Sequence, residues 1–171
     1  LHSSAASDVY KRQIVDQVIS KCKALIFIVN KWDKIEKSTS TMKEFKADIR
    51  LQYKELDHFP ILFISSTTKQ RVNKVLETAW SVYERSKKII PTNKLNVLIE
   101  KAMNDNPPPA EKGKVIKINY CVQVHKQPAV IALFTNYPKL IKVSYQRFLM
   151  NQIRSNFDLK GIPIRLSFRK K

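Results

Sequence analysis

Short, uninterrupted runs of apolar residues mark two strands in the first half of the chain. Residues 24–29 read Ala-Leu-Ile-Phe-Ile-Val and residues 61–64 read Ile-Leu-Phe-Ile. Such runs are typical of parallel strands that are covered on both faces. Helical spacing predicts a helix that ends near Lys23, a second one after Thr41 and a third over about 70–88. The alternation of strands and helices predicts an α/β domain with a parallel sheet and flanking helices.

The third of these helices carries its apolar residues on one stripe. The stripe consists of Val72, Val75, Leu76, Ala79, Trp80 and Tyr83. A stripe at helical spacing is nearly always part of a core. We therefore expect these side chains to be buried, and we assign Trp80 no functional role.

The second half of the chain has the pattern of a smaller α+β unit. Apolar spacing after Thr92 predicts a helix, and Pro107-Pro108-Pro109 then predicts an extended connector. Apolar and polar residues alternate over 116–124, which predicts a half-buried antiparallel strand. The residues expected to face inward are Ile116, Ile118, Tyr120, Val122 and Val124.

A second strand, one long helix and a third strand complete this unit. We expect a strand over 130–135, a helix that is capped by Asn136 and reaches about Phe157, and a last strand over 164–169. The residues that this helix should bury are Ile141, Tyr145, Phe148 and Leu149. The predicted order of elements is α-β-β-α-β.

Three segments follow from these patterns. Residues 1–13 (LHSSAASDVYKRQ) do not start with Met and lack apolar periodicity, so we interpret them as a non-native junction in front of a truncated reading frame. Lys87, Lys88 and Pro91 end the helical pattern. We therefore place the domain boundary between residues 88 and 89, which gives one domain over 14–88 and another over 89–171.

The net charge of +18 is unevenly distributed along the 171 residues. Residues 1–85 carry 15 Lys and Arg against 10 Asp and Glu, whereas residues 86–171 carry 17 against 4. The positive charge of the second half favours binding to a polyanion, and a nucleic acid is the natural partner. A soluble domain from a lysine-rich proteome is the alternative. Two cysteines fit a reducing cytoplasm, and neither a membrane-spanning run nor a metal-ligand spacing occurs.

The tetrapeptide Asn30-Lys31-Trp32-Asp33 follows directly after the first apolar run. The carboxylate of Asp33 could accept two hydrogen bonds from the N1–H and N2–H₂ groups of guanine. Adenine lacks this pair of donors and would leave the carboxylate unpaired. Asn30 would offer its amide to the purine, and the stem of Lys31 would lie over the base. An ordinary turn after a strand is the alternative.

A second polar segment, Ser65-Ser66-Thr67-Thr68, follows the second apolar run. Backbone N–H groups of Ser65, Ser66 and Thr67 could approach the guanine O6, although a Ser/Thr helix cap would look the same. Both segments should lie beyond the carboxyl ends of parallel strands, where open α/β sheets bind ligands. The phosphate loop G-x-x-x-x-G-K-[ST] is absent, since the chain has only Gly113 and Gly161.

From about Ile14 to Lys171 the chain resembles the C-terminal part of the Der family, also called EngA, of bacterial tandem GTPases. The stretches that carry the resemblance are KALIFIVNKWDKIEK, ILFISSTTKQRVNKVLE, the NPPP segment and SYQRFLMNQIRSNF…GIPIRLSFRKK. Ser66 stands where the family usually has Ala, and Lys69 stands where Gly is common. The resemblance implies the end of the second P-loop GTPase domain followed by a KH-like domain.

In the family, GTP binding and hydrolysis couple to assembly of the large ribosomal subunit. The resemblance therefore implies a cytoplasmic monomer that binds GTP or GDP and ribosomal RNA and has no membrane partner. Catalytic residues, the phosphate loop and the site of Mg²⁺ would all lie in the part of such a protein that this sequence lacks. We expect this chain alone neither to hydrolyse GTP nor to bind it tightly.

A KH domain normally clamps nucleic acid with a GXXG loop, which neither this chain nor the Der family has. A basic surface is what remains for RNA. The candidates are Lys117, Lys139, Lys142, Arg147, Arg154, Arg165, Arg169, Lys170 and Lys171. Two alternatives stay open: a stand-alone RNA-binding module with a vestigial guanine pocket, and a chain in which only residues 92–171 fold stably.

Overall fold

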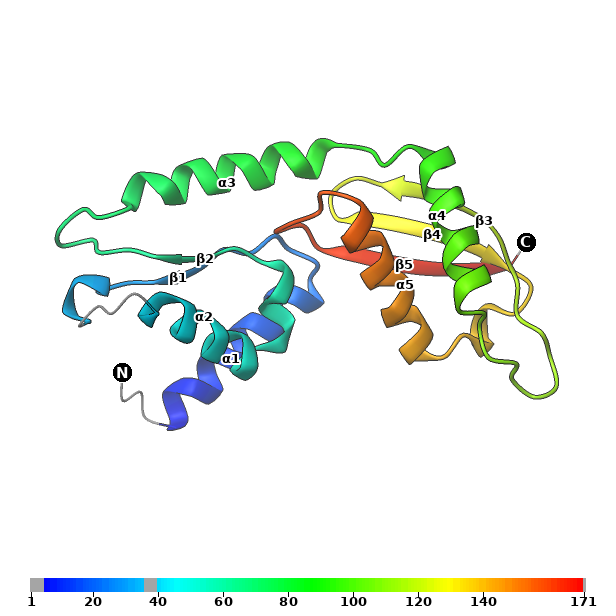
Figure 1. Ribbon diagram of the computed structural model, residues 1–171, viewed down its shortest axis with the longest axis horizontal. Coiled ribbons are helices and arrows are strands. Elements are labelled where there is room, and N and C mark those ends of the chain that lie inside the picture. Colours follow the sequence, from blue (N-terminus) through cyan, green and yellow to red (C-terminus); the bar gives the residue numbers. More distant parts are fainter. Residues whose placement is uncertain (1–4, 36–39, 171) are drawn as a thin grey trace. The chain divides into compact units, whose positions relative to one another are not determined.

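The computed structural model describes residues 5–35 and 40–170. The described chain divides into two compact units, which are presented separately. The first runs up to Glu84 and also contains Lys160–Pro163. The second contains Arg85–Leu159 and the chain from Ile164 onward. The predicted fold class, an α/β part with a parallel sheet followed by a second sheet with helices, is confirmed (Figure 1).

The first unit is built around a parallel pair of strands. Its elements are α1 (Ala5–Ser20), β1 (Phe27–Val29), the 3₁₀ turn η1 (Trp32–Lys34), α2 (Thr41–Gln52), the 3₁₀ turn η2 (Lys54–His58), β2 (Ile61–Phe63) and α3 (Val72–Lys87), whose last turn continues beyond this unit. Residues 27–29 of β1 pair with residues 61–63 of β2 in register. The carboxyl ends of both strands therefore meet at the same edge.

Two apolar clusters hold this unit together. One contains Val15, Tyr53, Leu56 and Phe59, and the other contains Trp32, Ile61 and Phe63. Phe27 and Ile49 pack against both clusters and so connect them. Helix α1 contributes Val15 and begins at Ala5, so it includes most of the segment that we had set aside as a junction.

The apolar stripe of α3 is not the core that we predicted. Leu76 is 72% exposed, Trp80 65% and Tyr83 48%, while Val72 and Val75 are half-buried. The buried residue of this helix is Val82, at 4% exposure. Helical spacing shows that residues share a face, but burial needs a partner for that face, and the described part of this unit contributes two strands that leave it uncovered.

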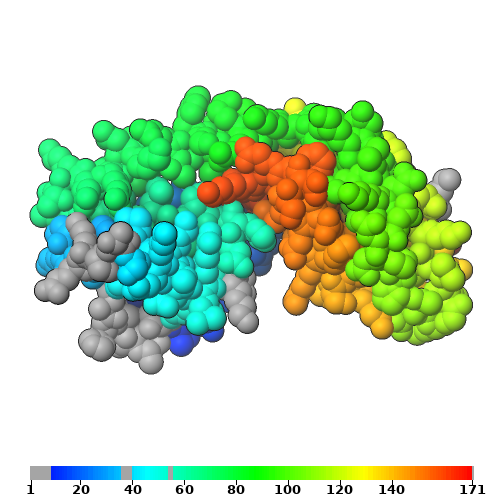
Figure 2. All heavy atoms as spheres, viewed as in Figure 1, coloured from blue at the N-terminus to red at the C-terminus, as the bar shows by residue number. Residues whose placement is uncertain are grey.

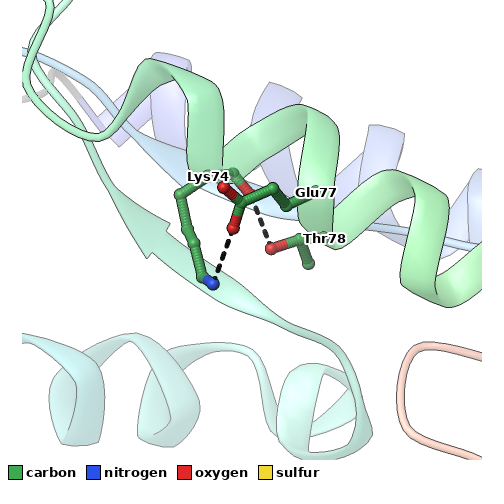
Figure 3. Close-up of polar contacts among 3 residues, drawn as sticks. All are labelled: Lys74, Glu77 and Thr78. Carbon is green, nitrogen blue, oxygen red and sulfur yellow. Dashed lines mark hydrogen bonds and ion pairs between the residues drawn. The ribbon is translucent and has the colours of Figure 1, made fainter.

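Two polar contacts lie within α3, and one close contact connects it to another segment of the unit. Lys74 pairs with Glu77 one turn later at 2.8 Å, and the hydroxyl of Thr78 donates to the Lys74 carbonyl at 2.7 Å (Figure 3). Such exposed pairs add only tenths of a kcal/mol. The close contact is at Gly161, where φ is +81° and an added Cβ would lie 2.7 Å from Val82 Cγ2. Glycine at this position therefore lets the chain pass directly over Val82.

The second unit has helices on one face of a three-stranded sheet. Its elements are α4 (Thr92–Asp105), β3 (Ile118–His125), β4 (Ala129–Thr135), the 3₁₀ turn η3 (Pro138–Leu140), α5 (Val143–Asn156) and β5 (Ile164–Lys170). The strand order is β3-β4-β5, with β3 antiparallel and β5 parallel to β4. Helices α4 and α5 lie side by side over the same face of this sheet (Figure 1). The order α-β-β-α-β agrees with the sequence pattern.

The alternation predicted along β3 breaks at a β-bulge. The register with β4 shifts between Ile118 and Tyr120, and residues beyond the shift turn to the opposite face. Ile118 is buried as expected, but Tyr120 is 46% exposed and Cys121 is completely buried. Asn96 on α4 holds the backbone here, accepting from Cys121 N at 2.9 Å and donating to Cys121 O at 2.8 Å.

The single long helix expected after Asn136 is split in two. A 3₁₀ turn comes first, and α5 begins only at Val143. Asn136 caps neither element. Its side chain accepts from Lys117 N at 2.9 Å and donates to the Val115 carbonyl at 2.9 Å, tying the start of β3 to the end of β4. Tyr145 and Leu149 of α5 are buried, as predicted.

Candidate functional site

The polar segments after β1 and β2 are joined by the side chain of Asn30. Its Nδ2 donates to the Ser66 hydroxyl at 3.0 Å. Its Oδ1 accepts from Ser66 N at 3.1 Å and from Lys31 N at 2.7 Å. The parallel pairing of β1 and β2 brings the two segments to one edge, and the amide then fastens them to each other.

The chain after Asn30 is held by a tryptophan beneath it. Lys31 adopts the left-handed conformation with φ 60°, which turns the chain sharply into η1. Trp32 donates its backbone N–H to the Ile64 carbonyl at 3.0 Å. Its ring is 2% exposed and packs on Phe63 and Phe45, with ring centroids at 4.5 Å and 5.3 Å. This anchor leaves Lys31 exposed and Asp33 half-buried.

The segment after β2 forms a closed turn. Ser65 is completely buried, and its N–H donates to the Gln70 carbonyl at 3.1 Å. Its hydroxyl accepts the N–H of Thr68 at 3.1 Å. Lys69 has a φ of 57°, a conformation that glycine adopts without strain. The turn therefore needs a left-handed residue at the position where the resembled family often has Gly.

These bonds change which backbone amides could meet a base. The N–H of Ser65 belongs to the turn, and the N–H of Ser66 belongs to Asn30. Thr67 is exposed, and within the described part of the chain its N–H has no hydrogen-bond partner. The sequence pattern named all three residues without distinguishing them, because a serine-rich motif does not reveal how its amides are used.

The arrangement suits a purine that carries donors on one edge. Asn30 uses one Nδ2 hydrogen for Ser66, so the second can donate to a ring nitrogen. Asp33 provides a carboxylate three residues further on, in the half-buried turn η1. Among the described residues no group of three or more His, Cys, Asp or Glu side chains could hold a metal ion.

The basic candidates of the second unit divide by their place in the sheet. Lys117 precedes β3, Lys139 lies in η3, and Arg169 and Lys170 end β5. Ile118 pairs with Thr135, which pairs with Lys170. The four basic residues Lys117, Lys139, Arg169 and Lys170 therefore belong to one end of the sheet. Arg165 pairs with Val130 at the other end. Lys171 lies outside the described residues.

Three further candidates lie on or next to α5, and two of them are already engaged. Lys142 forms an ion pair with Glu111 at 2.9 Å. Arg154 donates to the Leu159 carbonyl at 3.5 Å, and burial lowers its pKa to about 10. Arg147 is exposed. Among the described helices, none combines the length and apolar character that a membrane-spanning helix requires.

The fold and its loops define a class. A parallel-strand edge that carries an N-K-W-D segment, joined in sequence to an α-β-β-α-β unit, has the pattern of a guanine-nucleotide-binding domain followed by a KH-like domain. Residues 90–169 match the family model described as KH-domain-like of EngA bacterial GTPase enzymes, C-terminal.

Similar curated proteins extend this match to most of the chain. GTPase Der of Desulforamulus reducens is 46% identical over 160 residues, which cover 94% of this chain and 36% of that protein. The Christiangramia forsetii GTPase Der is 44% identical over 149 residues (87% and 34%), and the Streptococcus uberis one is 42% identical over 162 (95% and 37%). The chain belongs to the Der (EngA) family, as the sequence had indicated, and spans about a third of the length of these relatives.

Proposed function

We propose that the first unit recognises guanine at the edge formed by the ends of β1 and β2. The observation that carries this proposal is the pair of hydrogen bonds that joins Asn30 to Ser66, because it assembles one site from two loops. The membership of the Der family, whose curated relatives are named GTPases, supports it.

Each residue has a separate part in this proposal. Asp33 accepts the N1–H and N2–H₂ donors of guanine, and the remaining Nδ2 hydrogen of Asn30 binds a purine nitrogen. The stem of the exposed Lys31 covers the base plane. The N–H of Thr67 approaches O6, while Ser65 and Ser66 maintain the turn.

In a whole Der protein this base site would serve GTP and GDP. The phosphates would be bound by a phosphate loop, which this sequence does not contain. Mg²⁺, when bound there, neutralises phosphate charge during hydrolysis. The residues described here would contribute base specificity, which decides that a guanine nucleotide drives the cycle.

We further propose that the second unit docks on ribosomal RNA during assembly of the large ribosomal subunit, in the cytoplasm and as a monomer. The match to the KH-domain-like model supports this, as do the 17 basic residues against 4 acidic ones in 86–171. The four basic residues at one sheet end (Lys117, Lys139, Arg169 and Lys170), together with Arg147, Arg165 and Lys171, supply the phosphate contacts. Lys142 and Arg154 contribute less, because an ion pair and partial burial hold them.

A comparison of three nucleosides tests the base site. Guanosine, inosine and adenosine at millimolar concentrations are compared by saturation-transfer NMR on the chain. Inosine lacks the N2–H₂ donor and adenosine lacks both donors, so binding should weaken in that order, by about tenfold or more for adenosine. Equal signals from guanosine and adenosine would refute base recognition.

The RNA proposal is tested by the salt dependence of binding to ribosomal RNA fragments. Affinity should fall as the salt concentration rises, with a log–log slope of about −0.7 to −0.9 for each phosphate neutralised. Exchanging Arg169 and Lys170 for Gln should make this slope shallower by between one and two units. A slope that does not change would exclude this end of the sheet as the contact.

A further inference from the structure

An open groove lies between α4 and the end of α5 in the second unit. Its volume is ≈ 370 Å³, within the range of clefts that hold small ligands, roughly 300–1,000 Å³. Both helices face the viewer in Figure 2, where α4 is green and α5 orange. None of the basic residues that the sequence pattern assigned to RNA lines this groove.

Two lysines give the groove its charge. Lys94 and Lys101 lie two helical turns apart on α4, about 10 Å along the axis, and both are exposed. In the described part of the chain neither ammonium group has an ion-pair partner, and no carboxylate lines the groove. Asp158 is adjacent in sequence to a lining residue, but Arg85 pairs with it at 2.8 Å. The groove is therefore suited to an anion.

Two asparagines give the groove an unused amide nitrogen and an unused carbonyl oxygen. The Oδ1 of Asn93 accepts the N–H of Lys94 at 2.8 Å, which leaves its Nδ2 to donate. The Nδ2 of Asn156 donates to the Gln152 carbonyl at 2.9 Å, which leaves its Oδ1 to accept. An edge that pairs an acceptor with a donor, as nucleobases do, complements this arrangement.

Apolar surface completes the groove. Phe157 and Leu98 line it while packing with part of their surface against the core of the unit, so both are held in place. An aromatic ring next to unpaired cations is the combination on which unstacked bases of single-stranded nucleic acid lie. In a duplex the base edges are already paired and stacked, so they could not enter.

We propose that this groove binds one nucleotide of single-stranded RNA. The base lies against Phe157 and Leu98, its edge meets Asn93 and Asn156, and Lys94 and Lys101 bind the flanking phosphates. The inference rests on the proposal that the second unit docks on RNA. It adds a base pocket on the helical side, separate from the basic end of the sheet.

The test uses the full chain and a fluorescein-labelled, mixed-sequence 12-nucleotide RNA that cannot fold on itself. Fluorescence anisotropy compares the wild type with the double variant Lys94→Gln/Lys101→Gln. A variant of equal charge, Lys112→Gln/Lys126→Gln, is the control, because both lysines are exposed in the same unit and neither lines the groove. The groove variant should bind about tenfold more weakly, with a salt slope shallower by about 1.4, while the control changes less than about threefold.

Two further measurements separate a base pocket from general attraction. Phe157→Leu keeps an apolar side chain but removes the ring, so binding should weaken about threefold or more with an unchanged salt slope. A 12-base-pair duplex of the same sequence should bind the groove variant and the charge control equally. If the single strand also fails to distinguish these two variants, the groove proposal is wrong while RNA docking stands. If the wild type binds no RNA at 50 mM salt, RNA docking itself is refuted.

Discussion

Asn30 and Ser66 lie 36 residues apart, and a side-chain amide joins them. Asn30 donates to the hydroxyl of Ser66 at 3.0 Å and accepts its backbone N–H at 3.1 Å. The same Oδ1 accepts the N–H of Lys31 at 2.7 Å. The side-chain amide of Asn30 thus fixes the conformation of two loops at the sheet edge, and both loops carry residues of the proposed base site.

Removing this amide should cost more than removing its hydroxyl partner. Asn30→Ala leaves two backbone N–H groups without their acceptor, and because the site is exposed water replaces part of the loss. We expect a decrease of about 1 kcal/mol in the free energy of unfolding, measured with urea, and loss of guanosine binding. Ser66→Ala keeps the backbone bond and should cost less than half as much. Equal costs would show that the hydroxyl, not the amide, organises the loops.

The two tryptophans should behave as opposites. Trp80 is 65% exposed, so acrylamide should quench it readily, and Trp80→Gln should change stability by no more than about 0.5 kcal/mol. Trp32 is 2% exposed against two aromatic rings, so Trp32→Ala should cost about 3–5 kcal/mol. The fluorescence that remains in Trp80→Gln should resist quenching. A strongly destabilised Trp80→Gln variant would mean that the α3 stripe is covered.

Replacing Lys69 with glycine should stabilise the protein. Its φ of 57° costs an ordinary residue about 1–2 kcal/mol, part of which the greater flexibility of unfolded glycine offsets. Lys69→Gly should raise the free energy of unfolding by about 0.5–1 kcal/mol. The same exchange at Lys74, within α3, should lower it by about 1 kcal/mol. Destabilisation by Lys69→Gly would show that the lysine side chain itself holds the turn.

The stability of the second unit should decline in alkaline solution because of Cys121. Burial raises the pKa of this thiol from 9.0 to about 12, so the folded protein keeps a proton that the unfolded chain loses. The resulting stabilisation is complete below pH 9 and is lost as the pH rises to about 12. Burial raises the pKa of Tyr145 in the same direction, from 10.0 to about 12.

Urea unfolding at pH 8.5 and pH 10.5 measures this effect. Between these values the wild type should lose about 1–2 kcal/mol more than Cys121→Ala, which no longer has the titrating thiol. Both proteins retain Tyr145, so its contribution cancels in the comparison. Identical losses in the two proteins would contradict the role given to the buried thiol.

The strands were predictable where burial depends on local pattern alone. Continuous apolar runs located β1 and β2, and the order of elements in the second unit, α-β-β-α-β, followed from the spacing of its apolar residues. The prediction that the α3 stripe is buried was wrong, because the burial of Trp80 depends on what lies opposite the helix. The bulge in β3 was missed because the alternation in the sequence continues without a break over 116–124, and only the pairing with β4 shows that Cys121 turns inward.

The candidate base site shows the same limit. The sequence pattern brought Asn30 and Ser66 to one sheet edge, because both follow parallel strands. It could not show that the Asn30 side chain accepts the N–H of Ser66, because the hydrogen-bond partner of a backbone amide is set only in the folded turn. The groove between α4 and α5 was missed for a related reason: Lys94 and Phe157 are 63 residues apart and carry no shared motif.

Asp33→Asn tests most directly whether the Asp33 carboxylate recognises the donor edge of guanine. Xanthine has an acceptor in place of the 2-amino group, so an asparagine amide complements xanthine better than guanine. Saturation-transfer NMR with guanosine and xanthosine should show guanosine preferred by the wild type and by the exposed control Asp48→Asn, and xanthosine preferred by Asp33→Asn. If Asp33→Asn keeps the wild-type preference, or if the wild type prefers neither nucleoside, Asp33 does not recognise the base.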